Sequence, residues 1–300
     1  MIFDATRGYF ILTYSYVFII MVFWNFSHGF SDVDDQIIWS QVTQHWMKIK
    51  TKALPKTQKL HKGSRRCMFV INHTSMADLF LIDLFLRSRC NYLARYGVIM
   101  FCPFLSIVTV FMNSIWFFKR GGRGDDLEPF FQFLDRNFNW FMTARHHISC
   151  FPEGHRSVKP YMLPLKSGMI RYAYERGLLI QPLITFGVEN AMNEFTLRKT
   201  WGESSTIEYF IGETIDPNDY KPGTGKGDPK NWNVDSFFEI VEDTIYKAFE
   251  NNHELILEEN KRHRYLREGE ERQLYESAKP GNISKTLKEY AIEKRRKKRH

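Results

Sequence analysis

Apolar and polar positions follow two different patterns in the middle of the chain. Apolar runs of strand length occur at Cys67–Ile71, Ser114–Phe118, Ile148–Phe151, Leu178–Phe186 and Ile207–Ile211. Apolar residues at helical spacing occur between or after these runs, at about Met76–Arg87, Leu127–Phe138, Ser167–Arg176 and Val234–Phe249. Strands and helices that alternate in this way predict an α/β domain, with a mainly parallel sheet flanked by helices.

An uncharged stretch from Gly8 to Ser27 lies near the N-terminus. As a helix, these residues would rise about 30 Å, which is the thickness of the hydrocarbon core of a bilayer. Tyr9 and Trp24 lie near its two ends, where interfacial aromatic residues are common. A secretory signal peptide is the alternative, but the preceding charge is weak and no convincing cleavage site of small residues follows. The stretch therefore predicts an uncleaved N-terminal helical membrane anchor.

A second, amphipathic helix is predicted at Asp34–Lys52, where Ile38, Val42, Trp46 and Ile49 form one apolar stripe. It could pack on the α/β domain or lie in the lipid headgroup layer, and the second arrangement would give a membrane foot of two helices. The chain then divides into three parts: the anchor with its amphipathic helix at 1–52, the α/β domain at 53–252, and a charged helical and basic tail at 253–300.

Composition and charge narrow the range of partners. Aromatic residues make up 16% of the chain, with 26 Phe, which suits a membrane-facing surface or an apolar ligand pocket as well as a Phe-rich core. The formal charge is +8, but residues 253–300 hold 14 Lys and Arg against 9 Asp and Glu, so the rest of the chain carries only +3. A modestly basic body suits an anionic membrane or a phosphorylated substrate. Nucleic-acid binding is not expected, because no recognisable module accompanies the charge.

The four cysteines are widely spaced and form no CxxC pair; they are Cys67, Cys90, Cys102 and Cys150. This spacing argues against a zinc site and gives no disulfide framework. All four lie in or beside apolar segments, so they are predicted to be buried thiols.

His73 and Asp78 raise the question of how two polar residues five positions apart could act together. On one continuous helix their side chains would point about 140° apart. A predicted strand precedes His73 and a predicted helix follows it, so His73 is expected on the turn between them. Ser75 and Asp78 have the spacing of a capping box, which would let Asp78 fold back toward this turn. Asp78 is therefore predicted either to cap the helix alone or to hold His73 in a catalytic pair.

A second strand-turn segment follows at Phe151–Ser157, with Pro152 and Gly154 marking the turn. α/β sheets usually bind ligands at the carboxyl ends of their strands, and an arginine there can bind a phosphate through two hydrogen bonds. Arg156 is therefore a candidate phosphate ligand. The alternative is a salt bridge between Glu153 and Arg156 that only closes the loop.

Together, Asn72-His73-x-x-x-x-Asp78 and Phe151-Pro152-Glu153-Gly154-His155-Arg156-Ser157 resemble the first and third signature blocks of the glycerophospholipid acyltransferase family, which includes the 1-acylglycerol-3-phosphate acyltransferases. The second block is matched loosely by residues 113–120, which end in Arg120, and the fourth by residues 180–183. The resemblance extends over roughly residues 65–212. Two departures are present: His155 replaces the usual threonine, and the second block lacks its glycine.

The resemblance implies an enzyme that transfers a fatty acyl group from acyl-CoA to the hydroxyl of a lysophospholipid, most simply lysophosphatidic acid to give phosphatidic acid. His73 would be the general base and Asp78 would orient it. The groups expected around the acceptor phosphate are Arg120, Glu153, Gly154 and Arg156. Lys119 and Lys166 are lesser candidates, since Lys166 could instead be the solvated start of a helix. Glu153 would orient the loop or contact the glycerol part of the substrate. No metal or cofactor is expected, because a thioester is already activated.

The family mechanism also bears on Val98–Phe118, a second uncharged stretch. Pro103 and Asn113 argue against a membrane span, and a full crossing would place His73 and Arg120 on opposite sides of the bilayer. The stretch is therefore interpreted as a buried helix followed by a strand.

The C-terminal Lys297-Lys298-Arg299-His300 resembles the dilysine retrieval signal of endoplasmic reticulum membrane proteins. It predicts that location, with the catalytic domain facing the cytosol. Two other functions stay open: a coenzyme-independent transacylase that takes its acyl group from another phospholipid, and a catalytically silent lipid-binding scaffold.

Overall fold

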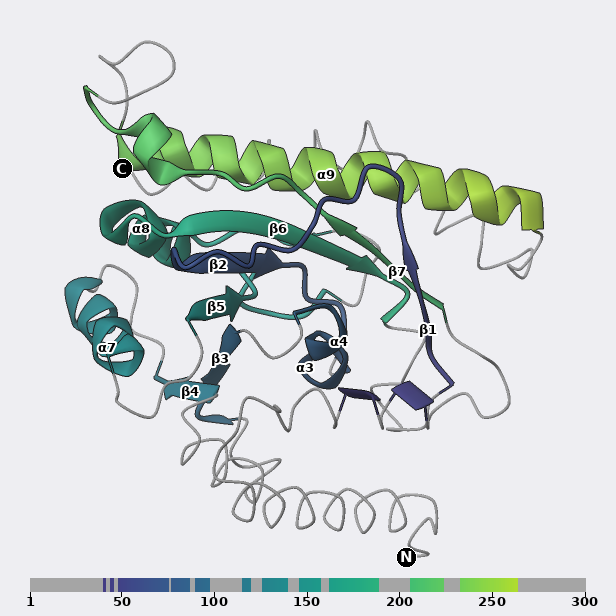
Figure 1. Ribbon diagram of the computed structural model, residues 1–300, viewed down its shortest axis with the longest axis horizontal. Coiled ribbons are helices and arrows are strands. Elements are labelled where there is room, and N and C mark those ends of the chain that lie inside the picture. The colour runs from purple at the N-terminus through teal and green to yellow at the C-terminus, as the bar shows by residue number, and fades with distance from the viewer. Residues whose placement is uncertain are drawn as a thin grey trace, which may run out of the picture.

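Figure 1 shows a computed structural model of the chain. The structure describes residues 40–41, 44–45, 48–75, 77–86, 90–97, 115–119, 126–139, 146–157, 162–188, 206–223 and 233–263.

The described residues form one seven-stranded sheet with the strand order β1-β7-β6-β2-β5-β3-β4. The strands are β1 (Lys50–Ala53), β2 (Cys67–Ile71), β3 (Cys90–Arg95), β4 (Ile115–Phe118), β5 (His147–Cys150), β6 (Leu179–Phe186) and β7 (Thr206–Ile211). Five of them, β2 to β6, are parallel to one another, while β7 pairs antiparallel with β6 and β1 pairs parallel with β7. Both predicted features of the fold class, the mainly parallel sheet and the flanking helices, are confirmed.

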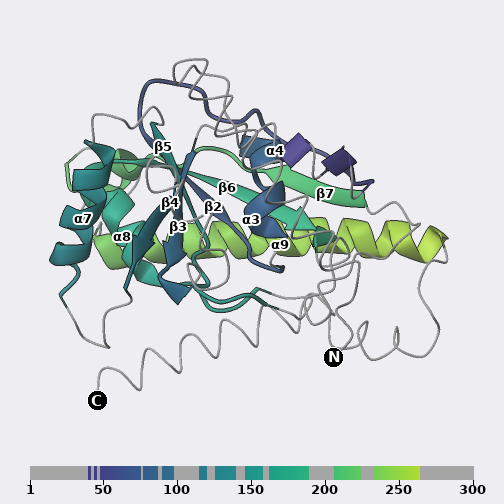
Figure 2. The same cartoon turned by 90° about the horizontal axis from the view of Figure 1, so that it is seen from below.

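Helices cover both faces of this sheet (Figures 1 and 2). They are α3 (Asp78–Leu81), α4 (Asp83–Leu86), α7 (Glu128–Phe138), α8 (Ser167–Arg176), the 3-10 turn η2 (Pro217–Tyr220) and α9 (Val234–His263). Alternate residues of a strand point to opposite faces. Phe69 of β2 therefore lies in the core under α3 and α4, while Met68 and Val70 lie in the core under α7, α8 and α9.

The predicted boundaries need three corrections. The helix expected at Asp34–Lys52 ends before Lys48, whose φ of 49° is incompatible with a continuing helix, and Lys50–Ala53 is the strand β1. The helix expected at about Met76–Arg87 is divided at Ile82 into α3 and α4. The division placed between residues 252 and 253 falls inside α9, which continues to His263.

Several predictions fall partly or wholly outside the described residues. No helix in the described part of the chain is long and apolar enough to cross a membrane, and the predicted anchor at residues 8–27 lies outside that part. The same holds for residues 98–114, where a buried helix is expected, and for the tail beyond residue 263. Cys67, Cys90 and Cys150 are buried free thiols, as predicted, and Cys102 lies outside the described residues.

Candidate active site

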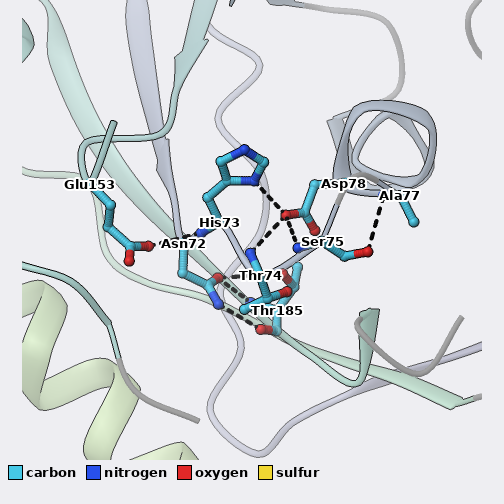
Figure 3. Close-up of polar contacts among 8 residues, drawn as sticks. All are labelled: Asn72, His73, Thr74, Ser75, Ala77, Asp78, Glu153 and Thr185. Atoms are coloured by element: carbon cyan, nitrogen blue, oxygen red, sulfur yellow. Dashed lines mark hydrogen bonds and ion pairs between the residues drawn. The ribbon is translucent and has the colours of Figure 1, made fainter. Parts of the chain in front are cut away.

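His73 and Asp78 meet at the carboxyl end of β2 (Figure 3). The strand ends at Ile71, the chain turns through His73, and α3 begins at Asp78. His73 Nδ1 lies 2.7 Å from Asp78 Oδ2. The change from strand to helix between the two residues therefore brings together side chains that a continuous helix would hold apart.

The same carboxylate oxygen also organises the turn. Asp78 Oδ2 accepts hydrogen bonds from the backbone N–H groups of Thr74, at 2.8 Å, and Ser75, at 3.0 Å. The Ser75 hydroxyl accepts from the N–H of Ala77, not from the N–H of Asp78 as a regular capping box requires. Asp78 therefore bonds to His73 and to the turn before α3, but it does not cap the helix: the N-cap of α3 is Ala77, and no side chain of the described residues caps it.

The His73 ring is oriented by two contacts. Nδ1 bonds to Asp78, and the ring stacks on Phe151 with the centroids 4.1 Å apart. The side chain is 22% exposed, whereas Asp78 is fully buried. A hydrogen bond from Nδ1–H to a carboxylate fixes the tautomer that leaves Nε2 as the basic nitrogen. The arrangement can therefore accept a proton at Nε2 from a bound hydroxyl group.

The turn after β5 lies directly beside His73, because β2 and β5 are neighbouring parallel strands. Glu153 points inward from this turn and is 2% exposed. Its Oε1 accepts the backbone N–H of His73 at 2.9 Å, and its Oε2 accepts that of Leu163 at 2.6 Å. The His73 carbonyl in turn accepts the N–H of Ser157 at 2.7 Å. Both backbone groups of His73, its N–H and its C=O, are thus hydrogen-bonded to the segment that follows β5.

Burial raises the pKa of Glu153 to about 7, and the nearby charge of Asp78 acts in the same direction. The hydrogen bonds from Leu163 and His73 oppose this change because they stabilise the ionised form. Of the roles considered for Glu153, these contacts favour orienting the loop over binding a phosphate.

Gly154 and Lys166 lie beside each other at the same turn, and Lys166 Nζ is buried. Gly154 has a φ of 68°, and a Cβ atom there would lie 2.3 Å from Lys166 Nζ. The Lys166 backbone N–H donates to the carbonyl of Pro152 at 2.8 Å. The structure therefore brings Lys166, Glu153 and Gly154 together, while Arg156 is exposed two residues further on. Phosphate binding by these residues stays a prediction.

The structure describes only one of the two basic residues at the end of β4, Lys119 and Arg120. Lys119 directly follows β4 and is exposed, and Arg120 lies outside the described residues. β4 and β5 are parallel and are separated only by β3. Their carboxyl ends are therefore about 10 Å apart at the usual strand spacing.

Two residues that touch this site were missed from the sequence. Arg95, the last residue of β3, donates from Nη2 to the carbonyl of Gly154 at 2.5 Å. An arginine that ends a strand beside β5 would have indicated this contact, but the strand itself was not predicted. Asn72 belongs to the first sequence block, but its sequence context did not indicate that its side chain bonds to Thr185 of β6.

Within the described residues, no cluster of three or more His, Cys, Asp or Glu side chains could hold a metal ion.

The family model named Acyltransferase matches residues 48–185, a range that includes every site residue described above. Residues 48–185 belong to the Acyltransferase family. The resemblance of the two sequence blocks to glycerophospholipid acyltransferases is thereby confirmed at the level of the family.

The acyltransferase fold is also shared with a solved structure, the crystal structure of the 1-acyl-sn-glycerophosphate (LPA) acyltransferase PlsC from Thermotoga maritima. The TM-score is 0.54 at 18% identity, over 80% of this chain and 92% of that one. At this identity the match shows the fold. No curated protein sequence matches the chain significantly.

Proposed function

We propose that this acyltransferase is a membrane-bound enzyme that moves a fatty acyl group from acyl-CoA to the free hydroxyl of a lysophospholipid. Lysophosphatidic acid, giving phosphatidic acid, is the acceptor we favour. The observation that carries the proposal is the 2.7 Å contact between His73 and Asp78, placed beside a turn that bears cationic side chains. The name of the solved relative, an LPA acyltransferase, supports the same acceptor.

In the proposed reaction, His73 Nε2 accepts the proton of the acceptor hydroxyl as its oxygen attacks the thioester carbonyl carbon. Asp78 stabilises the imidazolium that forms, as a carboxylate does in a serine-protease triad. The tetrahedral intermediate then collapses, the C–S bond breaks, and the sulfur of coenzyme A takes the proton from His73. The nucleophile is the substrate itself, so no acyl-enzyme forms and no metal or cofactor is required.

The phosphate of the acceptor would be bound by Arg156 and Arg120, with Lys166 and Lys119 as further cations. Charge-assisted hydrogen bonds to phosphate are roughly twice as strong as neutral ones. Gly154 would leave room for the Lys166 side chain beside the turn, and Glu153 would hold that turn against His73. Lys166 Nζ lies over Gly154, which supports a position for this cation beside the turn.

The remaining proposals concern location. The uncharged residues 8–27 would anchor the enzyme in the membrane that holds its lipid substrate and product. Lys297 and Lys298 would keep it in the endoplasmic reticulum, with the catalytic domain on the cytosolic side.

The decisive experiment incubates the purified full-length protein with a panel of lysophospholipids and acyl-CoAs and identifies the products by mass. We expect a diacylated product that requires added acyl-CoA, and no product from the His73→Ala variant. Product formed without acyl-CoA would indicate a transacylase, and no product with any pair would support the silent scaffold.

A further inference from the structure

Asn72, the residue before His73, bonds to β6 through its side chain after β2 has ended. The regular pairing of these strands stops at Ile71 and Leu183, whereas β6 continues to Phe186. Asn72 Nδ2 donates to the carbonyl of Thr185 at 2.8 Å, and Asn72 Oδ1 accepts the Thr185 N–H at 2.8 Å. The Thr185 hydroxyl also donates to Oδ1, at 3.3 Å. Figure 3 shows these bonds beneath His73.

These bonds reproduce the pairing that another residue of β2 would have made. A side-chain amide offers the same donor and acceptor as a peptide group. Both Asn72 and Thr185 are 1% exposed, so the Thr185 backbone groups would have no access to water if Asn72 did not bind them. The side chain of Asn72 therefore keeps the edge of β6 paired while the backbone of residue 72 is released to turn away.

Because the backbone of residue 72 does not pair with β6, the chain can turn so that His73 bonds to the segment after β5. His73 donates its N–H to Glu153 and accepts the N–H of Ser157, both in the segment after β5. Consecutive residues are thus fixed to opposite neighbours of β2: Asn72 to β6, and His73 to the turn after β5. Because these bonds fix the backbone on both sides of the His73 Cα, they set the direction in which the imidazole leaves the chain.

We propose that Asn72 is a positioning residue for acyl transfer, whose side-chain amide sets the orientation of His73 Nε2 toward the acceptor hydroxyl. The inference rests on the proposed function and deepens it. Asn72 acts through His73 and has no contact with the acceptor phosphate, whose candidate ligands lie on other elements. The role therefore predicts a loss of turnover without a matching loss of acceptor binding.

The test compares Asn72→Ala with Asn91→Ala in the full-length protein. Asn91 is a matched control because it is also a buried asparagine in the sheet, and its Nδ2 donates to the carbonyl of His147 at 3.2 Å near the amino end of β3. With oleoyl-CoA as donor and lysophosphatidic acid as varied acceptor, we expect Asn72→Ala to lower kcat by about 10- to 100-fold, the effect of a misplacement on the order of 1 Å. The acceptor KM should stay within about threefold. Asn91→Ala should lower the melting temperature to a similar extent and retain kcat.

A double-mutant cycle with His73→Ala separates positioning from general destabilisation. If Asn72 acts through the imidazole, adding Asn72→Ala to His73→Ala should cause no further loss of the residual rate. Should Asn72→Ala fail to fold, Asn72→Ser, which keeps one hydrogen-bonding group, takes its place in every comparison.

Three results would overturn the inference: a wild-type kcat in the folded Asn72 variant, an equal loss of kcat in Asn91→Ala, or the same fold-loss when His73 is already absent. A wild-type protein that acylates no lysophospholipid would instead overturn the proposed function, and the inference with it. In each of those three results the wild-type protein still acylates its acceptor, so failure of the inference alone is distinguishable from failure of the proposed function.

Discussion

Asp78 Oδ2 accepts three hydrogen bonds, from His73 Nδ1 and from the backbone N–H groups of Thr74 and Ser75. The other oxygen, Oδ1, is buried and has no hydrogen-bond partner within the described part of the chain. One oxygen therefore both holds the turn and orients the imidazole of His73. Changes at Asp78 should disturb structure and chemistry together, whereas changes at His73 should disturb chemistry alone.

The first prediction distinguishes the effects of His73 and Asp78 on the reaction rate and on stability. His73→Ala should lower the acyl-transfer rate by about 10²- to 10⁴-fold, the usual contribution of a positioned base. Its melting temperature should stay near the wild-type value, because the ring is partly exposed and caps no helix. Asp78→Asn should lose a similar rate, since an amide does not stabilise the imidazolium or hold the same tautomer. It should also lose stability, on the order of 1–3 kcal/mol, because a neutral amide oxygen is a weaker acceptor than a carboxylate and the NH₂ group would be buried where Oδ1 has no partner among the described residues.

Steady-state rates and thermal melts of both variants provide the measurement. A wild-type rate in either folded protein would contradict the assignment of the base and its partner.

The second prediction concerns Arg156. Lysine keeps the charge but lacks the planar fork that binds phosphate through two bonds, so Arg156→Lys should raise the acceptor KM and lower kcat/KM. Binding of acyl-CoA should change less. Arg136→Lys on α7 is the control, because that arginine is also exposed but its Nε donates within its own helix, to the carbonyl of Gln132. An unchanged acceptor KM and kcat in folded Arg156→Lys would remove Arg156 from the site.

The third prediction uses the raised pKa of Glu153. A carboxyl whose pKa is about 7 in the folded protein, against 4.5 in the unfolded chain, binds more protons in the folded state between these values. Its contribution to stability is therefore fully present below about pH 4.5 and is lost as the pH rises through 7. Glu153→Gln cannot ionise and lacks this dependence.

The melting temperature of the wild type should accordingly fall relative to that of Glu153→Gln as the pH rises from about 5 to 8. Comparing the two proteins at each pH cancels the titration of all other groups. A difference that stays constant over this range would mean that Glu153 is ionised throughout.

At the scale of helices and strands, burial decides what the sequence could predict. β2, β5 and β6 were found within one residue at each end, because their apolar runs are buried between two layers. β1 was missed because all four of its residues are exposed at the edge of the sheet. β3 was missed because polar residues interrupt its apolar positions, although Asn91 is fully buried.

In the candidate site, contacts between residues close in sequence could be predicted, and contacts between distant segments could not. The contact between His73 and Asp78 could be predicted because a strand, a turn and a helix within a dozen residues determine it. The bond between the His73 backbone and Glu153 could not, because it joins segments 80 positions apart and involves an N–H group that every residue type carries.

The fourth prediction concerns the turn after β5. Gly154 and Gly223 both have positive φ angles, 68° and 82°, but only Gly154 has a side chain, Lys166, where a Cβ would lie. Alanine at either position should cost about 1 kcal/mol in stability through backbone strain. Only Gly154→Ala should also displace Lys166 and lower kcat/KM for the acceptor, by about tenfold if one charge-assisted bond is lost.

Melts and acceptor kinetics of the two variants, measured together, isolate the effect of the Lys166 side chain. Equal kinetics in both would show that the position of Lys166 does not matter for the reaction.

At the scale of the whole molecule, the sheet brings the candidate site residues to the carboxyl ends of its parallel strands. His73, Glu153 and Lys119 all follow the carboxyl ends of parallel strands, and Lys166 is bonded to the turn after β5. An amphiphilic acceptor would present its phosphate and hydroxyl to this edge while its acyl chain stays in the lipid. The proposed anchor at residues 8–27 would keep the enzyme at the membrane that supplies such a substrate.

The fifth prediction tests that anchor. Deleting residues 1–30 should release much of the protein from carbonate-washed membranes, because it removes the long uncharged N-terminal stretch. Some binding through the apolar stripe at residues 38–49 should persist. Fractionation identical to that of the full-length protein would contradict an anchor at residues 8–27.

The central place of β2 in the sheet has a consequence for synthesis of the chain on the ribosome. Both neighbours of β2 come later in the sequence: Glu153 is 80 positions after His73, and Thr185 is 113 positions after Asn72. At a synthesis rate of roughly 5–20 residues per second, the last of these partners emerges roughly 6 to 23 seconds after Asn72. During this interval the histidine and the aspartate have been made but are not yet held in place. A nascent acyltransferase of this design is therefore expected to stay inactive until most of its sheet has folded.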